Sequence, residues 1–261
     1  MPSEQLGQVM LVGAGPGAAD LLTVRALRAI EGAQALLYDA LISDEVLALT
    51  PKRCLRIRTG KRAGGDSMNQ AVINGLMLKL ARRGLKVVRL KGGDPSVFGR
   101  SGEEKDYLEQ HGVQVEVVPG VTAASAAAAQ FGFPLTHRGE ARRLVFATAR
   151  TSNGKIVGGG WAACADDQAT LALYMARDSA DAVADCLMDA GRRAATPALV
   201  IENAGRADAR AVRTTLAELG PAVRSMGSTG PTLLMVGEVC AQATAAELNT
   251  QPADCSRGKA S

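Results

Sequence analysis

Hydrophobic and polar positions follow two periods that alternate along the chain. Short runs of Val, Leu and Ile predict buried strands, and longer segments with apolar residues three and four positions apart predict amphipathic helices. The runs expected to be strands are residues 9–12, 35–38, 53–59, 87–90, 113–118, 144–149, 170–175, 197–201 and 231–236. The segments expected to be helices are residues 20–31, 41–49, 67–83, 101–111, 121–130, 179–190 and 215–223.

The regular succession of strands and helices predicts an α/β fold. Strands that alternate with helices form largely parallel sheets, and one such sheet is expected in each half of the chain. The pair Pro119-Gly120 predicts a boundary between an N-terminal α/β domain, residues 8–119, and a C-terminal α/β domain, residues 120–248. Residues 249–261 are polar and are expected to form a disordered tail.

One expected strand is followed by residues that indicate a ligand site. The apolar run 87–90 leads into Lys91-Gly92-Gly93-Asp94-Pro95. The two glycines lack side chains, so the backbone can press against a ligand, and Pro95 stops the strand. Asp94 adds a carboxylate at the same edge, and ligands of open α/β sheets bind at the carboxyl ends of strands. Taken alone, these residues are equally typical of a tight turn.

A second glycine-rich segment, residues 13–17, follows the first expected strand. Gly13, Gly15 and Ala18 satisfy the loose dinucleotide-binding pattern, and Asp39 lies near the expected position of the acid that binds ribose. This interpretation makes the protein an NAD-dependent oxidoreductase. Pro16 interrupts the pattern, and an NAD site here leaves residues 91–95 without a role, so the NAD enzyme is the less favoured alternative.

Basic residues gather around the third expected strand. Arg56 and Arg58 lie on one face of the run 53–59, and the loop Gly60-Lys61-Arg62-Ala63-Gly64-Gly65 follows it. Small residues beside basic ones bring side-chain cations and backbone N–H groups together, which is typical of an anion-binding loop. A solvated charged loop explains the same residues.

The segment Ser101-Gly102-Glu103-Glu104 has the pattern of a capping box that opens a helix. In this motif the serine hydroxyl binds the backbone of the first turn, and a glutamate reaches back to the cap. Glu103 and Glu104 are therefore expected to be helix-start residues rather than catalytic acids.

Composition narrows the class of partner. Aromatic residues are only 3% of the chain, which argues against stacking on single-stranded nucleic acid, and the net charge of +4 fits an anionic small molecule as well as a polymer. The 5 cysteines are scattered without a Cys-x-x-Cys pair and there are only 2 histidines, so neither a disulfide framework nor a metal site is expected. There is no signal peptide or membrane-length apolar run, so we expect a cytoplasmic protein that binds no membrane.

Several of these segments together resemble the uroporphyrinogen-III C-methyltransferases, a branch of the tetrapyrrole methylase family. The resemblance extends from Val9 to Val239 and rests on Val12-Gly13-Ala14-Gly15-Pro16-Gly17, Leu37-Tyr38-Asp39-Ala40-Leu41, Gly60-Lys61-Arg62, Val88-Arg89-Leu90-Lys91-Gly92-Gly93-Asp94-Pro95, Phe98-Gly99-Arg100 and Pro134-Leu135-Thr136-His137-Arg138. The Gly-Gly-Asp-Pro segment marks the wider superfamily. The chain departs from the family at Thr148-Ala149-Arg150, where Thr-Gly-His is usual, and at Gly205-Arg206.

The resemblance implies a fold, a cofactor and an assembly. The expected fold is two α/β domains of the tetrapyrrole methylase type, with S-adenosylmethionine in a cleft between them, and the expected assembly is a homodimer. The spent cofactor is S-adenosylhomocysteine. By motif, the residues that bind the cofactor are Pro16, Gly92, Gly93, Asp94, Val97, Thr122, Ala123, Met175, Ala204 and Thr232.

The resemblance also implies a reaction, the methylation of uroporphyrinogen III at C2 and C7 to give precorrin-2 for sirohaem or cobalamin synthesis. In the related bifunctional sirohaem synthase the matching aspartate and lysine are the proton acceptor and donor, and here they are Asp39 and Lys61. The basic residues expected to receive the substrate's carboxylates are Arg56, Arg58, Arg62, Lys91 and Arg100. A superfamily methylase that acts on a later corrin intermediate, on RNA or on protein stays open as an alternative.

Overall fold

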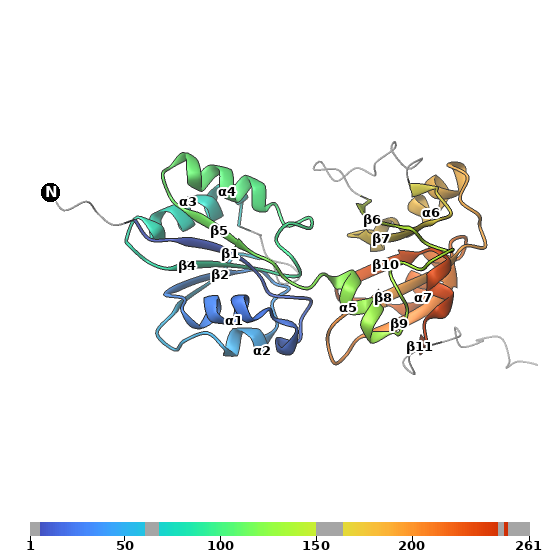
Figure 1. Cartoon of the computed structure of the whole chain (residues 1–261), viewed down its shortest axis with the longest axis horizontal. Helices are drawn as coiled ribbons and strands as arrows, with labels where there is room; N and C mark the ends of the chain where they lie inside the picture. The colour runs from blue at the N-terminus through green and yellow to red at the C-terminus, as the bar shows by residue number, and fades with distance from the viewer. Residues whose placement is uncertain (1–5, 61–67, 150–163, 245–247, 250–261) are drawn as a thin grey trace, which may run out of the picture. The chain divides into compact units, whose positions relative to one another are not determined.

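The computed structural model describes residues 6–60, 68–149, 164–244 and 248–249 (Figure 1). The chain divides into two compact units, Met1–Ala123 with Gly205–Ala207, and Ala124–Ala204 with Asp208–Ser261. Each unit has its own sheet and helices, so the predicted pair of α/β domains is confirmed. The domain limits 8–119 and 120–248 stay predictions, and the predicted tail lies outside the described residues except at Asn249.

The first unit contains a sheet of five parallel strands. They are β1 (Val9–Gly13), β2 (Ala35–Tyr38), β3 (Leu55–Arg58), β4 (Val87–Lys91) and β5 (Val115–Val118), in the spatial order β3-β2-β4-β1-β5. β4 lies at the centre and is buried along its whole length, as expected of a strand covered on both faces. Because every strand is parallel, all five carboxyl ends lie at one edge of the sheet.

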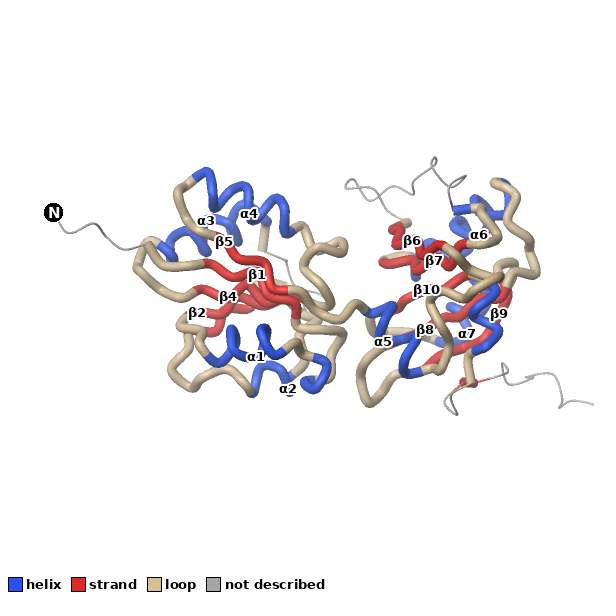
Figure 2. The backbone as a smooth tube through the Cα atoms, viewed as in Figure 1, coloured by secondary structure: helices blue, strands red, loops and turns tan. Residues whose placement is uncertain are grey.

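Helices cover both faces of this sheet (Figure 2). They are α1 (Val24–Glu31), α2 (Asp44–Ala48), α3 (Gln70–Ala81) and α4 (Ser101–Gln110). One core joins α1 and α2 to Leu36 and Leu90, and the other joins α3 and α4 to Leu11 and Leu37. Neighbouring residues of one strand therefore serve opposite cores, as the alternation of side chains in a strand requires.

Three of these helices begin at residues suited to capping. The side chains of Thr23, Ser43 and Asn69 accept hydrogen bonds from N–H groups in the first turns of α1, α2 and α3. Such caps satisfy donors that have no partner within the helix. The helix expected at 20–31 starts later than predicted, because residues 19–21 form a separate 3-10 turn before Thr23.

Successive connections change direction between two neighbouring strands. From β1 the chain passes over β4 to reach β2, toward the β3 edge of the sheet. From β4 it passes over β1 to reach β5, toward the opposite edge. Since β1 and β4 are adjacent, their carboxyl ends form a topological switch point, which is where ligands of open α/β sheets bind.

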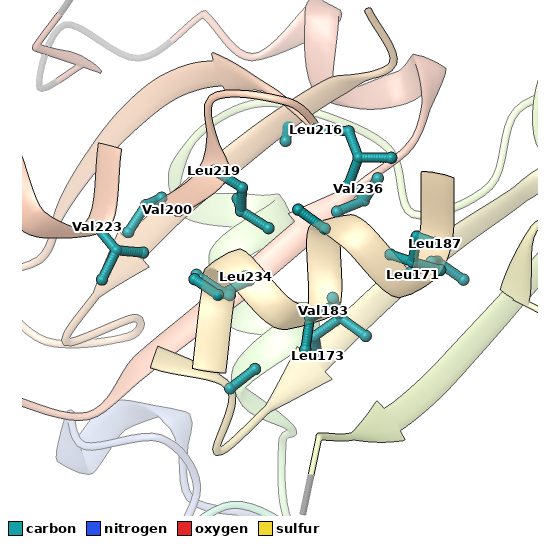
Figure 3. Close-up of a cluster of buried hydrophobic side chains, with 14 of the residues drawn as sticks. Leu171, Leu173, Val183, Leu187, Val200, Leu216, Leu219, Val223, Leu234 and Val236 are labelled. Atoms are coloured by element: carbon teal, nitrogen blue, oxygen red, sulfur yellow. The ribbon is translucent and has the colours of Figure 1, made fainter. Parts of the chain in front are cut away.

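The second unit contains a sheet in the order β11-β9-β8-β10-β7-β6. Its strands are β6 (Arg143–Thr148), β7 (Ala169–Tyr174), β8 (Pro197–Glu202), β9 (Arg210–Thr215), β10 (Thr232–Val236) and β11 (Leu248–Asn249), and its helices are α5 (Ala123–Gln130), α6 (Ala180–Asp189) and α7 (Leu219–Met226). α6 and α7 pack on one face of the sheet against Leu171, Leu173, Val200, Leu234 and Val236 (Figure 3). Each such buried leucine contributes about 1.5–3 kcal/mol.

The expectation of a largely parallel sheet is wrong for the second unit. β10 is antiparallel to both β7 and β8, and β8 is antiparallel to β9. The β8 and β9 strands are joined by the short segment 203–209, which is too short for the helical crossover that parallel neighbours need. β9 was not expected as a strand, and the helix expected at 215–223 instead runs over Leu219–Met226.

Candidate functional site

The loops that leave β1 and β4 are joined at the switch point by backbone hydrogen bonds. The N–H of Gly93 donates to the carbonyl of Gly15 at 2.7 Å, and the N–H of Gly15 donates to the carbonyl of Gly93 at 3.2 Å. The N–H of Ala14 also donates to the carbonyl of Lys91 at 2.8 Å. The two glycine-rich segments singled out in the sequence therefore form one structure.

Three glycines let the ends of β1, β4 and β5 approach one another. A Cβ at Gly13 would lie 2.6 Å from the nitrogen of Gly120, and a Cβ at Gly120 would clash with the carbonyl of Gly93. Gly93 has φ +67°, a left-handed conformation that other residues rarely adopt. The glycines thus bring backbone against backbone, which shapes the edge at which the ligand is expected.

The carboxylate of Asp94 joins the turn after β4 to the residues that follow β5. Its Oδ1 accepts a hydrogen bond from the N–H of Ser96 at 2.7 Å, and its Oδ2 accepts one from the N–H of Gly120 at 3.0 Å. The same turn contains a hydrogen bond from the N–H of Val97 to the carbonyl of Asp94 at 3.1 Å. Gly92, Gly93, Asp94 and Val97 are all half-buried, so they present surface at the switch point.

Pro16 is half-buried on the other loop of the switch point, and a later segment of the chain lies on it. Arg206 donates from Nη2 to the carbonyl of Leu41 at 2.6 Å and from Nε to the carbonyl of Pro16 at 3.5 Å. The N–H of Ala18 donates to the carbonyl of Gly205 at 2.9 Å, and a Cβ at Gly17 would overlap the Arg206 side chain. The Gly205-Arg206 departure from the family therefore has a packing role in the first unit.

Asp39 lies directly after β2 at the same edge. The register pairs Tyr38 with Leu90, so Asp39 is beside the end of β4. Its Oδ1 accepts a hydrogen bond from the N–H of Leu41 at 2.9 Å, and within the described residues its second oxygen has no hydrogen-bond partner. A half-exposed carboxylate next to a ligand edge, with one oxygen that makes no hydrogen bond to the described residues, is suited to accept a proton.

The predicted cations fall into distinct settings. Arg56 is exposed and donates to the carbonyl of Thr50 at 3.1 Å, and Arg58 is exposed at the end of β3. Arg100 forms a bidentate pair with Glu103 at 2.9 and 2.6 Å, and this hydrogen bonding raises the pKa of Arg100 and lowers the pKa of Glu103. Lys61 and Arg62 lie outside the described residues.

Lys91 is buried in an ionic cluster and is nearly inaccessible to solvent. It is 5% exposed, and its ammonium lies 2.8 Å from Oε2 of Glu104, whose other oxygen pairs with Arg89 at 3.2 Å. Burial lowers the pKa of Lys91, the neighbouring Arg89 lowers it further, and Glu104 opposes both. The predicted contact between Lys91 and substrate carboxylates thus conflicts with its position, because the ammonium is buried beside Glu104.

The helix predicted to open at residues 101–104 is confirmed, because α4 begins at Ser101 with Glu103 and Glu104 in its first turn, but the predicted capping box is wrong. The residue before α4 is Arg100, which has φ +57° and makes no side-chain cap. Glu104 is 0% exposed and faces β4 instead of its own helix start. The two glutamates therefore differ, since Glu103 pairs with Arg100 at the surface and Glu104 neutralises buried charge.

The predicted cofactor residues of the second unit meet at one edge of its sheet. Met175 follows β7, Ala204 lies just after β8, and Thr232 begins β10, whose register places it beside the ends of both strands. Met175 has φ +55° and is 56% exposed, an uncommon conformation for a large apolar residue and one often found at functional sites. The backbone N–H of Ala124 donates to the hydroxyl of Tyr174 at 3.3 Å, and the two residues before Ala124 in sequence are Thr122 and Ala123.

The structure thus gathers the predicted cofactor residues into two groups, one in each unit. Pro16, Gly92, Gly93, Asp94 and Val97 surround the switch point of the first unit, and Thr122 precedes α5. The predicted cleft between the domains stays a prediction. Within the described residues, no group of His, Cys, Asp and Glu is arranged to hold a metal ion, and no helix is long and apolar enough to cross a membrane.

The geometry of the first sheet contradicts the NAD alternative. In the dinucleotide-binding order β1 lies beside β2, whereas here β4 separates them. The first long helix begins only at Val24, so no helix N-terminus follows the glycines to hold a pyrophosphate.

A parallel sheet whose glycine-rich edge lies at a switch point, followed by a second, mixed sheet, is typical of α/β proteins that bind a ligand at the strand ends. The family model for Tetrapyrrole (Corrin/Porphyrin) Methylases matches residues 8–220, and the chain belongs to this family. The chain is 45% identical over 242 residues to a siroheme synthase of Xylella fastidiosa, covering 93% of this chain and 51% of that protein. It therefore spans about half the length of the curated relatives it matches.

Solved structures with similar folds cover nearly the whole of both chains. The uroporphyrin-III C-methyltransferase of Thermus thermophilus in complex with S-adenosylhomocysteine is 39% identical, with a TM-score of 0.75, and the match covers 89% of this chain and 93% of that one. A cobalt precorrin-4 methyltransferase is 30% identical with a TM-score of 0.80, covering 89% and 95%. Both are methyltransferases, in agreement with the resemblance seen in the sequence.

Proposed function

We propose that the protein transfers methyl groups from S-adenosylmethionine to C2 and C7 of uroporphyrinogen III and so forms precorrin-2 for sirohaem or cobalamin-type synthesis. The observation that carries this proposal is the convergence of the Gly93 turn, Asp94 and Asp39 at the switch point of a tetrapyrrole methylase sheet. The similarity to the Thermus thermophilus enzyme, over nearly its full length, supports the choice of substrate.

The chemistry asks little of the protein beyond alignment and one proton transfer. The methyl group of a sulfonium is already an activated electrophile, so the pyrrole carbon attacks it without a metal or a protein nucleophile. The attack leaves positive charge on the ring, which is relieved when the macrocycle loses a proton. Asp39 is the proposed acceptor of that proton, and Lys61, outside the described residues, is the proposed donor by resemblance alone.

The proposed cofactor site combines the two groups of edge residues. Pro16, Gly92, Gly93, Asp94 and Val97 are assigned from the first unit, and Thr122, Ala123, Met175, Ala204 and Thr232 complete the set. The glycine edge offers close backbone contact, and Met175 offers an exposed apolar side chain. Arg56, Arg58 and Arg100 are the proposed partners of substrate carboxylates, with Arg62 added by resemblance, and Lys91 is left out because it is buried against Glu104.

The direct test is turnover. The protein is incubated anaerobically with uroporphyrinogen III and S-adenosylmethionine, and the product is identified by mass and absorption. A gain of two methyl groups supports the proposal, and an unchanged substrate refutes it. Asp39→Asn should lower the methylation rate by ~10²–10⁴ while S-adenosylhomocysteine affinity by calorimetry stays at the parent value. A variant at the parent rate would remove Asp39 from the mechanism.

A matched pair of glycine variants tests the cofactor site. Gly93→Val adds bulk at the switch point, and Gly112→Val carries the same conflict with a left-handed backbone at a place where no atom lies within 4 Å of the added Cβ. Both variants should be less stable, but only Gly93→Val should lose S-adenosylhomocysteine binding. If Gly93→Val binds as tightly as Gly112→Val, the cofactor lies elsewhere.

A methylase of a later corrin intermediate is the second candidate. The TM-score of 0.80 to the cobalt precorrin-4 methyltransferase favours it, while the higher identity to the uroporphyrin-III enzyme favours the first. Turnover of a cobalt-precorrin in preference to uroporphyrinogen III would select the second candidate. A homodimer in the cytoplasm completes the proposal, and a stable monomer in light scattering at micromolar concentration would contradict the assembly.

A further inference from the structure

The buried cluster Arg89, Lys91 and Glu104 contains two cations and one carboxylate. All three side chains are nearly inaccessible, and Glu104 also accepts a hydrogen bond from Nε2 of Gln70 at 2.9 Å. Buried ion pairs contribute little to stability compared with apolar residues of the same volume, and a surplus charge contributes less still. Stability therefore does not explain why the protein contains this cluster, and a role in function is the alternative.

The hydroxyl of Thr59 connects the cluster to the end of β2. Arg89 donates from Nη1 to Oγ1 of Thr59 at 3.1 Å, and the Thr59 hydroxyl donates to the carbonyl of Tyr38 at 3.0 Å. The N–H of Thr59 donates to the same carbonyl at 2.8 Å. Because the Tyr38 carbonyl belongs to the peptide bond that precedes Asp39, this chain of hydrogen bonds ends at the backbone of Asp39.

The turn that follows Thr59 also packs against Asp39. A Cβ at Gly60 would lie 2.5 Å from the nitrogen of Ala40 and 2.9 Å from Cα of Asp39. The positive charge of the cluster also attracts Asp39, since the Asp39 carboxylate is one of the charges that favour the protonated ammonium of Lys91. Backbone contact and charge from the cluster therefore both converge on Asp39.

We infer that Glu104, Arg89 and Thr59 are positioning residues for Asp39: the buried cluster holds the Thr59 hydroxyl against the Tyr38 carbonyl and thereby fixes the Asp39 carboxylate at the ligand edge. This inference rests on the proposed function, in which Asp39 accepts a proton. Displacements on the order of 1 Å at a reacting group can cost ~10²-fold in rate, so a residue that never touches substrate can still control turnover.

The test replaces the connecting hydroxyl and leaves the charges in place. Thr59→Val is nearly isosteric and removes both hydrogen bonds, and it should lower kcat by ~10–100-fold with KM and S-adenosylhomocysteine affinity unchanged. Thr59→Ser keeps the hydroxyl and should turn over at the parent rate. Thr50→Val is the matched control, because Thr50 is a buried threonine of the same unit whose hydroxyl has no partner within the described residues.

A double-mutant cycle separates positioning from general damage. If Thr59 acts through Asp39, adding Thr59→Val to Asp39→Asn should cause no further loss of kcat. A further loss equal to that in the parent background would overturn the inference, as would Thr59→Val at the parent rate. Thr59→Ala serves the same cycle if the valine variant does not fold.

A parent protein that fails to methylate uroporphyrinogen III overturns the proposed function and the inference with it, whereas an active parent matched by an equally active Thr59→Val overturns the inference alone.

Discussion

Glu104 in the first unit and Glu202 in the second are both buried carboxylates, but they satisfy their charges in different ways. Glu202 accepts hydrogen bonds from the N–H groups of Thr229 and Gly230 at 2.7 and 2.6 Å and pairs with Arg210 at 2.6 Å. Arg210 is half-exposed, so that charge is balanced with the help of water. The two cations that pair with Glu104, Arg89 and Lys91, are both buried, so the pairing leaves a positive surplus.

The balance of charge in each network indicates whether its buried carboxylate has a structural or a functional role. The Glu202 network joins the end of β8 to the loop before β10 and contains no unbalanced charge, so its role is to hold a loop. The Glu104 network has one cation more than it has carboxylates, and Lys91, one of its two cations, is the last residue of β4 at the ligand edge. Such an arrangement resembles the preorganised charges of active sites more than a structural ion pair.

The largest effect is expected from removing Glu104. Glu104→Ala leaves two buried cations without the carboxylate that neutralises them, and loss of one member of a buried pair typically costs about 3–5 kcal/mol. The free energy of unfolding is measured by urea denaturation followed by circular dichroism. Glu103→Ala, at the adjacent exposed glutamate, is the control and should unfold near the parent midpoint. Equal midpoints for the two variants would contradict the charge assignment.

A smaller loss is expected from Glu202→Gln. The amide keeps the shape of the side chain, but it is a weaker acceptor for the two N–H groups and leaves Arg210 with water, so the expected cost is about 1–3 kcal/mol. The same urea experiment measures it. A loss as large as that of Glu104→Ala would mean that the two networks do not differ in the way described.

The comparison also predicts a pH dependence. Burial raises the pKa of Glu202, but the N–H of Gly230, Arg210 and the N–H of Thr229 outweigh it, so the pKa lies below its ordinary value of 4.5. The folded state therefore binds fewer protons than the unfolded chain, and the stabilisation is complete above pH 4.5 and lost as the pH falls through the folded pKa. The difference in unfolding free energy between parent and Glu202→Gln should shrink over this range. A difference that is constant with pH would refute the assignment.

The smallest effect is expected from Arg210→Met. The arginine is about half-exposed, so the pair is screened by water and its loss should cost about 0–1 kcal/mol. Because the two N–H donors remain, Glu202 is not left without partners. A loss larger than that of Glu202→Gln in the same denaturation series would show that the carboxylate depends on the ion pair rather than on the loop backbone.

The first unit was largely predictable because its signals are local. The apolar run before Gly92 identifies the central strand, and the glycines at 13, 93 and 120 mark the places where strand ends meet. The position of Asp39 at this edge could be predicted because it follows a strand of a parallel sheet, where every carboxyl end shares an edge. The residues that made the site recognisable are those whose role depends on their immediate neighbours in sequence.

The remainder depends on contacts between distant residues. Glu104 matched a helix-start pattern, and nothing in residues 101–104 indicates that Arg89 and Lys91 lie opposite it. β9 has arginines and threonines around a few apolar residues, so its pairing with β8 is visible only in the sheet. The left-handed backbone of Met175 likewise has no local signal, since glycine or asparagine is the residue that usually marks this conformation.

The return of residues 205–207 to the first unit has a consequence for the order in which the protein is made. When Ala123 leaves the ribosome, the whole parallel sheet has been synthesised, but Gly205 and Arg206 have not. At ~5–20 residues per second, this segment follows on the order of ten seconds later. Throughout that interval the glycine-rich turn at Pro16 and Gly17 lacks the side chain that packs over it, so the nascent first unit stays unfinished until much of the second has emerged.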